Sequence, residues 1–109
     1  MSYKIIILPK SEREIKRLSK KYRSFKADLA ELILLLQEQP QQGEPLGKDY
    51  FKIRLTISAK NKGKSGGARV VTHLKVLKET VIILSVYNKS EPDSISEDEI
   101  GDRLASADV

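Results

Sequence analysis

Residues 50–58 alternate between apolar and polar side chains, the period of two that predicts a strand with one buried face. Two more strands are predicted at 68–77 and 80–87, and the latter is apolar almost throughout, as in a central strand buried on both faces. A basic, glycine-rich segment at 61–67 is expected to form the turn before them. The continuous apolar run at 3–8 predicts a short, well-buried first strand.

Between the first strand and the other three, apolar residues recur at helical spacing. Ser11 and Glu14 match the two ends of a capping box, which predicts a helix over 11–22. A second helix is predicted over 24–39. Its many apolar positions predict burial on more than one side, either against the sheet and the first helix or against a partner. Segment 41–48 contains glycines and a proline, and we expect a loop there.

The predicted order of elements, β-α-α-β-β-β-α, is that of an α+β domain. In it, an N-terminal strand and a helical hairpin pack on a small, mainly antiparallel sheet. The 109 residues suit one core, so we expect a single domain over 1–109. Its last part, 91–109, is an acidic segment in which Ser96 and Glu99 match a second capping box and begin a short helix.

The net charge of +5 is unevenly distributed. Segment 91–109 carries seven carboxylates and one arginine, a net charge of −6, which leaves +11 on the first 90 residues. Such a basic body indicates a polyanion-binding surface, onto which the acidic tail is able to fold back.

Cysteine is absent and His73 is the only histidine, which excludes disulfides, thiolate metal sites and a histidine-rich metal site. No apolar run approaches the ~20 residues of a membrane span, and no signal peptide is evident. We therefore expect a cytoplasmic protein that has no membrane association, metal or cofactor.

Four cations lie where the last three predicted strands bring them together. Lys52 and Arg54 share the polar face of the first of these strands, Arg69 lies early in the second, and Lys89 follows the third. If the strands pair in order, these side chains converge on a patch suited to a phosphate backbone and to extra charge on phosphorus. In the alternative, Lys52 and Arg54 are only the solvated face of the sheet and Arg69 pairs with a carboxylate.

Two ring side chains accompany these cations. Tyr87 ends the last strand, where it either packs or offers a stacking platform for a base. His73 lies inside a strand, where a structural role is the more common one, although an ordinary imidazole titrates near pH ~6.5.

Four segments in order resemble the RelE/ParE superfamily of toxins from type II toxin–antitoxin pairs, and the resemblance covers nearly the whole chain. They are Gly-Glu-Pro-Leu-Gly at 43–47, Tyr-Phe-Lys-Ile-Arg-Leu at 50–55, Lys-Ser-Gly-Gly-Ala-Arg-Val-Val at 64–71 and Val-Tyr-Asn-Lys-Ser-Glu at 86–91. The last two look more like the RelE and HigB branches than the ParE branch. RelE-type members are ribosome-dependent mRNA endoribonucleases, which inhibit translation. Their metal-free reaction is attack of the ribose 2′-OH on the adjacent phosphate.

The resemblance also implies the catalytic residues. Lys52 and Arg54 fall on the family's pair of cations on the first strand after the helices. Arg69 falls on the arginine that holds the scissile phosphate. Lys89 falls on a basic residue that, as an arginine in the nuclease branch, is proposed as general acid.

The chain departs from the nuclease branch at two positions. Arg54 stands where that branch has lysine, and a guanidinium stays protonated, which makes it a poor base. The tyrosine that the branch carries past the last strand would fall near Ile95, so Tyr87 and His73 are its candidate substitutes.

Two other functions stay open at this point. One is a ParE-like toxin that poisons DNA gyrase without hydrolysis. The other is a non-toxic module of the same fold that binds nucleic acid or a partner. A toxin implies an antitoxin encoded by the adjacent gene, with ribosome and mRNA as further partners, and assembly as a homodimer or a toxin–antitoxin hetero-oligomer.

Overall fold

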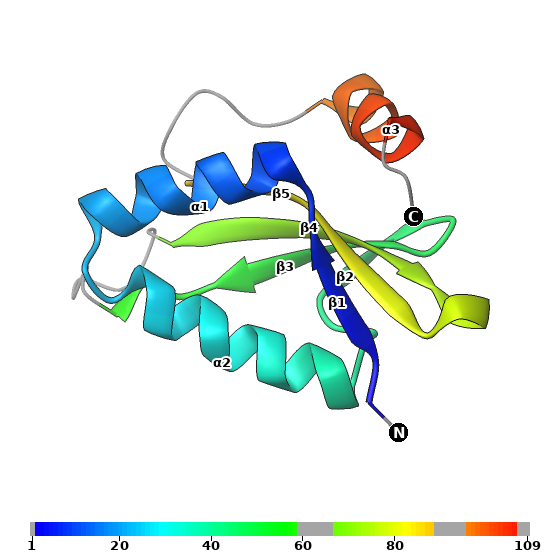
Figure 1. Ribbon diagram of the computed structural model, residues 1–109, viewed down its shortest axis with the longest axis horizontal. Coiled ribbons are helices and arrows are strands. Elements are labelled where there is room, and N and C mark those ends of the chain that lie inside the picture. The colour runs from blue at the N-terminus through cyan, green and yellow to red at the C-terminus, as the bar shows by residue number, and fades with distance from the viewer. Residues whose placement is uncertain (1, 59–66, 89–95, 107–109) are drawn as a thin grey trace.

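The computed structural model describes residues 2–58, 67–88 and 96–106, and Figure 1 shows their arrangement. The elements in order are β1 (Lys4–Ile7), α1 (Pro9–Lys21), α2 (Phe25–Glu38), β2 (Glu44–Gly47), β3 (Tyr50–Leu55), β4 (Ala68–Lys75), the 3₁₀ turn η2 (Val76–Lys78), β5 (Thr80–Asn88) and α3 (Glu97–Ala105). The predicted α+β class is confirmed. No helix among these residues is long and apolar enough to cross a membrane.

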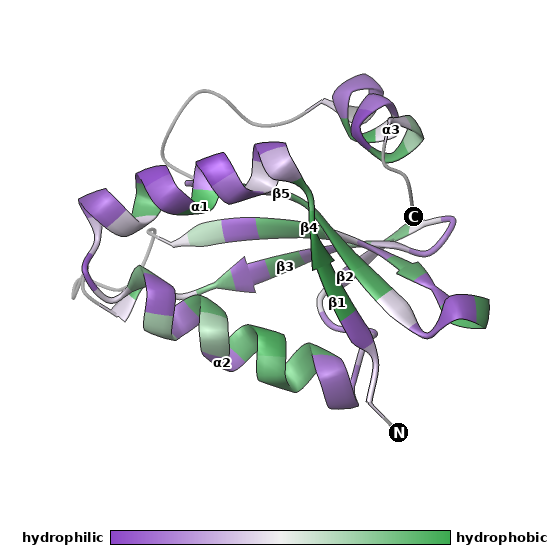
Figure 2. Ribbon diagram, viewed as in Figure 1, coloured by the Kyte–Doolittle hydropathy of each residue, from purple (hydrophilic) through white to green (hydrophobic). Residues whose placement is uncertain are grey.

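The five strands form one sheet in the order β1-β5-β4-β3-β2. β1 runs parallel to β5 and the other pairs are antiparallel, so the sheet is mainly antiparallel, as predicted. β5 lies between β1 and β4 and is buried along almost its whole length, which confirms the predicted central strand. Figure 2 shows the contrast between the apolar β1 and β5 and the polar α1.

The prediction of a loop at 41–48 is wrong for β2, which pairs antiparallel with β3. β2 is an edge strand with every residue exposed, so it shows no buried face from which to predict it. Pro45 also argues against a strand, but an edge strand tolerates proline because one side of it has no partner.

Buried side chains occupy both faces of the sheet. The face toward the helical hairpin, called here the hairpin face, holds Leu18, Phe25, Leu29 and Leu36 of the helices with Ile53, Val70, Val81 and Ile83 of the strands. The opposite face, called here the α3 face, holds Val71, Ile82 and Leu84, with Ile100 and Leu104 of α3 packed against them. The predicted C-terminal helix is confirmed, and the Ser96 Oγ at its start accepts a hydrogen bond from Glu99 N at 3.1 Å.

The predicted capping box at Ser11 is wrong. α1 begins two residues earlier at Pro9, whose fixed φ suits the first position of a helix. Ser11 Oγ instead donates to the Ile83 carbonyl at 2.9 Å, and Glu14 accepts from Val86 N at 2.9 Å. Because β1 pairs with β5 only as far as Ile83, these two side chains satisfy part of the β5 edge beyond it.

The sheet and α1 do not cover all the leucines of α2. Leu34 and Leu35 are 65% and 40% exposed, whereas Leu32 and Leu36 are buried. The prediction that the sheet and α1 bury α2 on more than one side is therefore wrong. The alternative, that a partner covers these leucines, stays a prediction.

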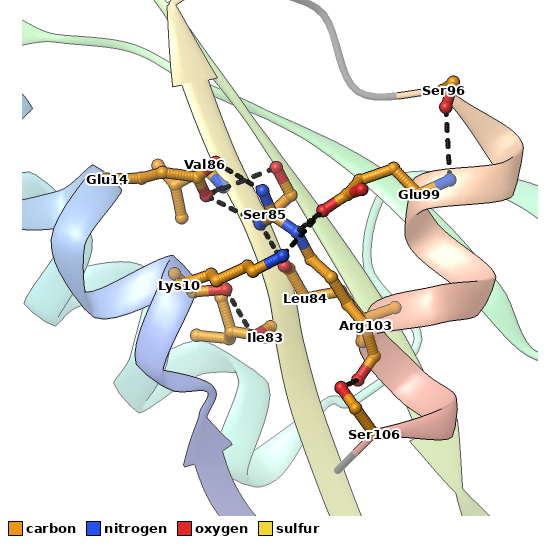
Figure 3. A network of polar contacts seen from close by, with 11 residues as sticks. Lys10, Glu14, Ile83, Leu84, Ser85, Val86, Ser96, Glu99, Arg103 and Ser106 are labelled. Carbon is orange, nitrogen blue, oxygen red and sulfur yellow. Dashed lines mark hydrogen bonds and ion pairs between the residues drawn. The ribbon is translucent and has the colours of Figure 1, made fainter.

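α3 is held to the rest of the fold by Arg103, as Figure 3 shows. Its guanidinium forms ion pairs at 2.9 Å with Glu14 of α1 and Glu99 of α3, and it donates to the Leu84 carbonyl of β5 at 2.8 Å. One side chain thus connects α3, α1 and the central strand.

Candidate functional site

A row of polar side chains crosses three strands on the α3 face. Arg54 of β3 lies directly opposite Arg69 of β4, which in turn lies opposite Tyr87 of β5. Lys52 is two residues before Arg54, so strand alternation places it on the same face. Pairing of the strands in order therefore brings these residues to one region, as predicted.

Lys52, Arg54 and Arg69 line one cavity of about 240 Å³ together with Gly43 and Glu44. Arg69 is only 9% exposed, and its Nη1 donates to the carbonyl of Ala68 at 3.3 Å. None of the three cations forms an ion pair with a carboxylate in the described part of the chain. A nearly buried cation is costly unless an anion neutralises it, so this cavity suits an anion.

Tyr87 is half-buried and packs beside the apolar cluster of the α3 face, next to Arg69 in register but outside the cavity lining. Lys89, Ile95 and most of the predicted turn at 61–67 lie outside the described residues. Of the five predicted catalytic residues, the fold thus gathers three in the cavity and places a fourth beside them.

The predicted catalytic residues do not include Glu44, the carboxylate of this cavity. It lies on β2, directly opposite Lys52. The sequence predicts a loop at 41–48, and a loop has no strand register that would place Glu44 beside Lys52. The register depends on Gly43, whose φ of +89° is left-handed and whose missing Cβ lets the Lys52 backbone approach closely.

His73 lies outside the cavity lining, on the same face of the sheet. The centroid of its ring lies 4.5 Å from that of Tyr50, its register partner on β3, and the interplanar angle is 42°. Burial lowers the pKa of His73, and the nearby charge of Lys75 lowers it further, while Asp49 opposes both. The structure thus gives His73 a packing partner, in keeping with the structural role expected of it.

Within residues 2–58, 67–88 and 96–106, no three histidine, aspartate or glutamate side chains are grouped so as to hold a metal ion. The chemistry of the cavity is that of three cations and one carboxylate. It can bind a phosphodiester, stabilise added negative charge on it, and accept a proton nearby.

The fold resembles that of the Escherichia coli toxin RelE, solved in the free state as a mutant with two arginines changed to alanine. The TM-score is 0.64 at 20% identity, over 96% of this chain and 97% of that one. No sequence among curated proteins matches the chain. Residues 5–92 match the family of ParE toxins of type II toxin–antitoxin systems, parDE. The closer likeness to the RelE and HigB branches expected from the sequence stays a prediction. Because the match covers most of its length, the chain belongs to the ParE toxin family, and so to the RelE/ParE superfamily.

Proposed function

We propose that this toxin is a ribosome-dependent mRNA endoribonuclease that acts in the cytoplasm and inhibits translation. The observation that supports the proposal is the single cavity that Lys52, Arg54 and Arg69 line with Glu44. Three cations around one space suit a phosphodiester, and a carboxylate at its edge suits proton removal from a neighbouring hydroxyl.

In the proposed reaction, the ribose 2′-oxygen attacks the adjacent phosphorus. A bond forms between that oxygen and phosphorus while the bond from phosphorus to the 5′-oxygen breaks, which leaves a cyclic phosphate and a free 5′-hydroxyl. Arg69 holds the phosphate, and Lys52 and Arg54 stabilise the charge that grows on its equatorial oxygens.

Glu44 is the base that the sequence alone does not provide. Arg54 cannot remove a proton from the 2′-hydroxyl because its guanidinium stays protonated, whereas a carboxylate accepts protons. Lys89 or Tyr87 then gives a proton to the leaving 5′-oxygen. Tyr87 has the phenol nearest Arg69 in the sheet register.

The family implies an antitoxin partner for this protein. We expect the adjacent gene to encode it and its acidic or apolar segments to cover the basic cavity, which would block RNA by charge and by volume. The exposed Leu34 and Leu35 of α2 are a further surface for such a partner.

A second function, poisoning of DNA gyrase without hydrolysis, is favoured by the match to ParE toxins. It is also favoured by Ile95, which stands near the place of a tyrosine in the nuclease branch. In that case the cavity would bind a protein carboxylate or a DNA phosphate and no bond would break.

The test is induction of the toxin without the adjacent gene, followed by mapping of mRNA 5′ ends. Growth arrest with cuts in register with codons is expected. Arg69→Ala should abolish both while its circular dichroism spectrum stays that of the parent, and Arg23→Ala, at an exposed arginine between α1 and α2, should change neither. Arrest with DNA-damage signalling and no cuts would support gyrase poisoning, and a folded but fully toxic Arg69→Ala variant would refute the site.

A further inference from the structure

A second and larger cavity, of about 420 Å³, lies between the β2–β3 turn and α3. It is lined by Leu46, Gly47, Lys48, Tyr50, Ile100 and Gly101. β3 contributes to both cavities: Tyr50 lines this one, Lys52 and Arg54 line the cationic one, and strand geometry places all three on the α3 face. Two residues along a strand span about 7 Å, so Tyr50 and Lys52 are neighbouring contact points for one extended ligand.

Tyr50 provides a fixed aromatic wall in this cavity. The ring is half-buried and contacts His73, with 4.5 Å between the ring centroids, so its orientation is set by packing within the sheet. Ile100 of α3 adds a second apolar side chain to the lining. Single-stranded RNA is commonly held by such rings, on which an unstacked base lies flat.

Gly101 is inside α3, where glycine lowers helix stability relative to alanine. A Cβ at this position would meet no atom within 4 Å, and the backbone there is not left-handed. Neither packing nor conformation therefore requires glycine. The missing side chain leaves room at the wall of the cavity that Gly101 lines.

The β2–β3 turn on the other side of the cavity also holds its two residues in an unfavourable backbone conformation. Lys48 and Asp49 have φ of +53° and +66°, and together they form the two-residue connection between β2 and β3. Such a turn is best made by Asn-Gly, because other residues resist the left-handed conformation. Here the chain accepts that strain and places a lysine at the lining of the cavity.

We propose that this cavity binds an unstacked base of single-stranded RNA, next to the phosphate held in the cationic cavity. Tyr50 stacks on the base, Ile100 contacts it from α3, and Lys48 contacts the phosphate of the same nucleotide. The inference rests on the proposed function, because it takes RNA as the ligand. It adds a subsite, and with it a source of sequence or positional preference, to the cleavage site.

The test uses the full-length protein on ribosomes that carry a short single-stranded RNA in which 2-aminopurine replaces one base at a time, with a 2′-deoxy sugar at the cleavage position. Stacking on Tyr50 should quench the fluorescence at one position only. Gly101→Ala should raise the melting temperature and weaken RNA binding roughly tenfold, the size of one lost base–aromatic stack. Lys48→Asn, which suits the turn better, should also weaken binding without loss of stability.

Tyr50→Phe is the matched control and should keep the quenching, whereas Tyr50→Leu should lose it. Absence of quenching with the parent protein, or equal RNA affinity of parent and Gly101→Ala, would overturn the subsite. If quenching is absent but the parent still cuts mRNA on ribosomes, the proposed nuclease function is supported and only the base-binding cavity is refuted. If quenching occurs but no cut is found, the nuclease function is refuted and the base-binding cavity is supported. A Gly101→Ala variant that keeps RNA affinity but escapes the antitoxin would assign the cavity to an antitoxin side chain instead.

Discussion

Arg54 and Arg69 lie directly opposite each other across β3 and β4, so the sheet pairs two guanidinium groups on one face. Like charges at directly opposed positions of a sheet destabilise it. This repulsion lies at the cavity that both arginines line. An anion bound there would remove the repulsion, so the fold should be more stable with its ligand than without it.

Neutralising one arginine should therefore separate stability from activity. Arg54→Gln is expected to raise the free energy of unfolding by a few tenths of a kcal/mol, because it removes the like-charge pair. The same change should weaken RNA binding and cleavage. Urea unfolding and a cleavage assay on ribosomes check the two effects, and a variant that is both less stable and equally active would contradict the assignment.

Glu44→Gln tests the proposed base. The amide cannot accept the proton of the 2′-hydroxyl, so the single-turnover cleavage rate should fall about 100-fold or more. RNA affinity should stay the same or rise, because a negative charge leaves a cationic cavity. Glu38→Gln, an exposed carboxylate at the end of α2, is the control and should keep the parent rate. An unchanged rate for Glu44→Gln would mean that the base lies elsewhere.

The meeting of Lys52, Arg54 and Arg69 was predictable from sequence because it needs only strand alternation and pairing of strands in order. The position of Glu44 in the cavity was not predictable, because an exposed edge strand has no buried face. The register of that strand also depends on the positive φ of Gly43. A local pattern does not reveal which partner a side chain will choose.

The helices illustrate the same limit. Ser11 and Glu14 have the spacing of a capping box, yet both are used by the edge of β5. Ser96 and Glu99 have the same spacing, and there the hydroxyl does cap the helix. The number of leucines on α2 likewise does not show how many of them the sheet covers, and Leu34 remains exposed.

Binding to RNA should depend on salt to an extent set by the three cations of the cavity. Each phosphate contact to a single strand contributes about −0.7 to the slope of log affinity against log salt. These three contacts, counted without that of Lys48, predict a slope near −2 and an affinity loss of about 20-fold between ~50 and ~200 mM salt. Arg69→Ala removes one contact and should therefore make the slope shallower by about 0.7. A flat response in the parent protein would indicate a partner that is not bound through its charge.

Arg103→Ala should loosen α3. The guanidinium side chain is 11% exposed and binds Glu14, Glu99 and the Leu84 carbonyl, so its loss should cost about 2 kcal/mol of unfolding free energy. Proteolysis should then cut α3 earlier than in the parent. Lys10→Ala is the control, because its 3.4 Å ion pair with Glu99 is exposed to solvent and should contribute little to stability. Equal losses of unfolding free energy in the two variants would contradict the role of Arg103 in holding α3.

Asp28 should make stability depend on pH in the acid range. Burial raises the pKa of its carboxyl, but hydrogen bonds from Ser58 N at 2.9 Å and from the hydroxyls of Ser58 and Ser24 at 2.8 Å outweigh it, and the pKa is lowered. These bonds connect α2 to the residues after β3. Because the folded state holds the proton less tightly than the unfolded chain, the stabilisation is fully present above the unfolded pKa of about 3.9. It is lost as the pH falls through the lower, folded value.

Asp28→Asn is therefore expected to lower the free energy of unfolding by about 1–2 kcal/mol at pH 7, where the charged hydrogen bonds are intact in the parent. The difference from the parent should narrow as the pH falls below about 4, because the parent carboxylate becomes protonated as well. Glu31→Gln, an exposed carboxylate on the same helix, should show little difference at any pH. Denaturant unfolding at several pH values measures this, and a gap that does not change with pH would show that the shape of the side chain, and not its charge, stabilises the contact.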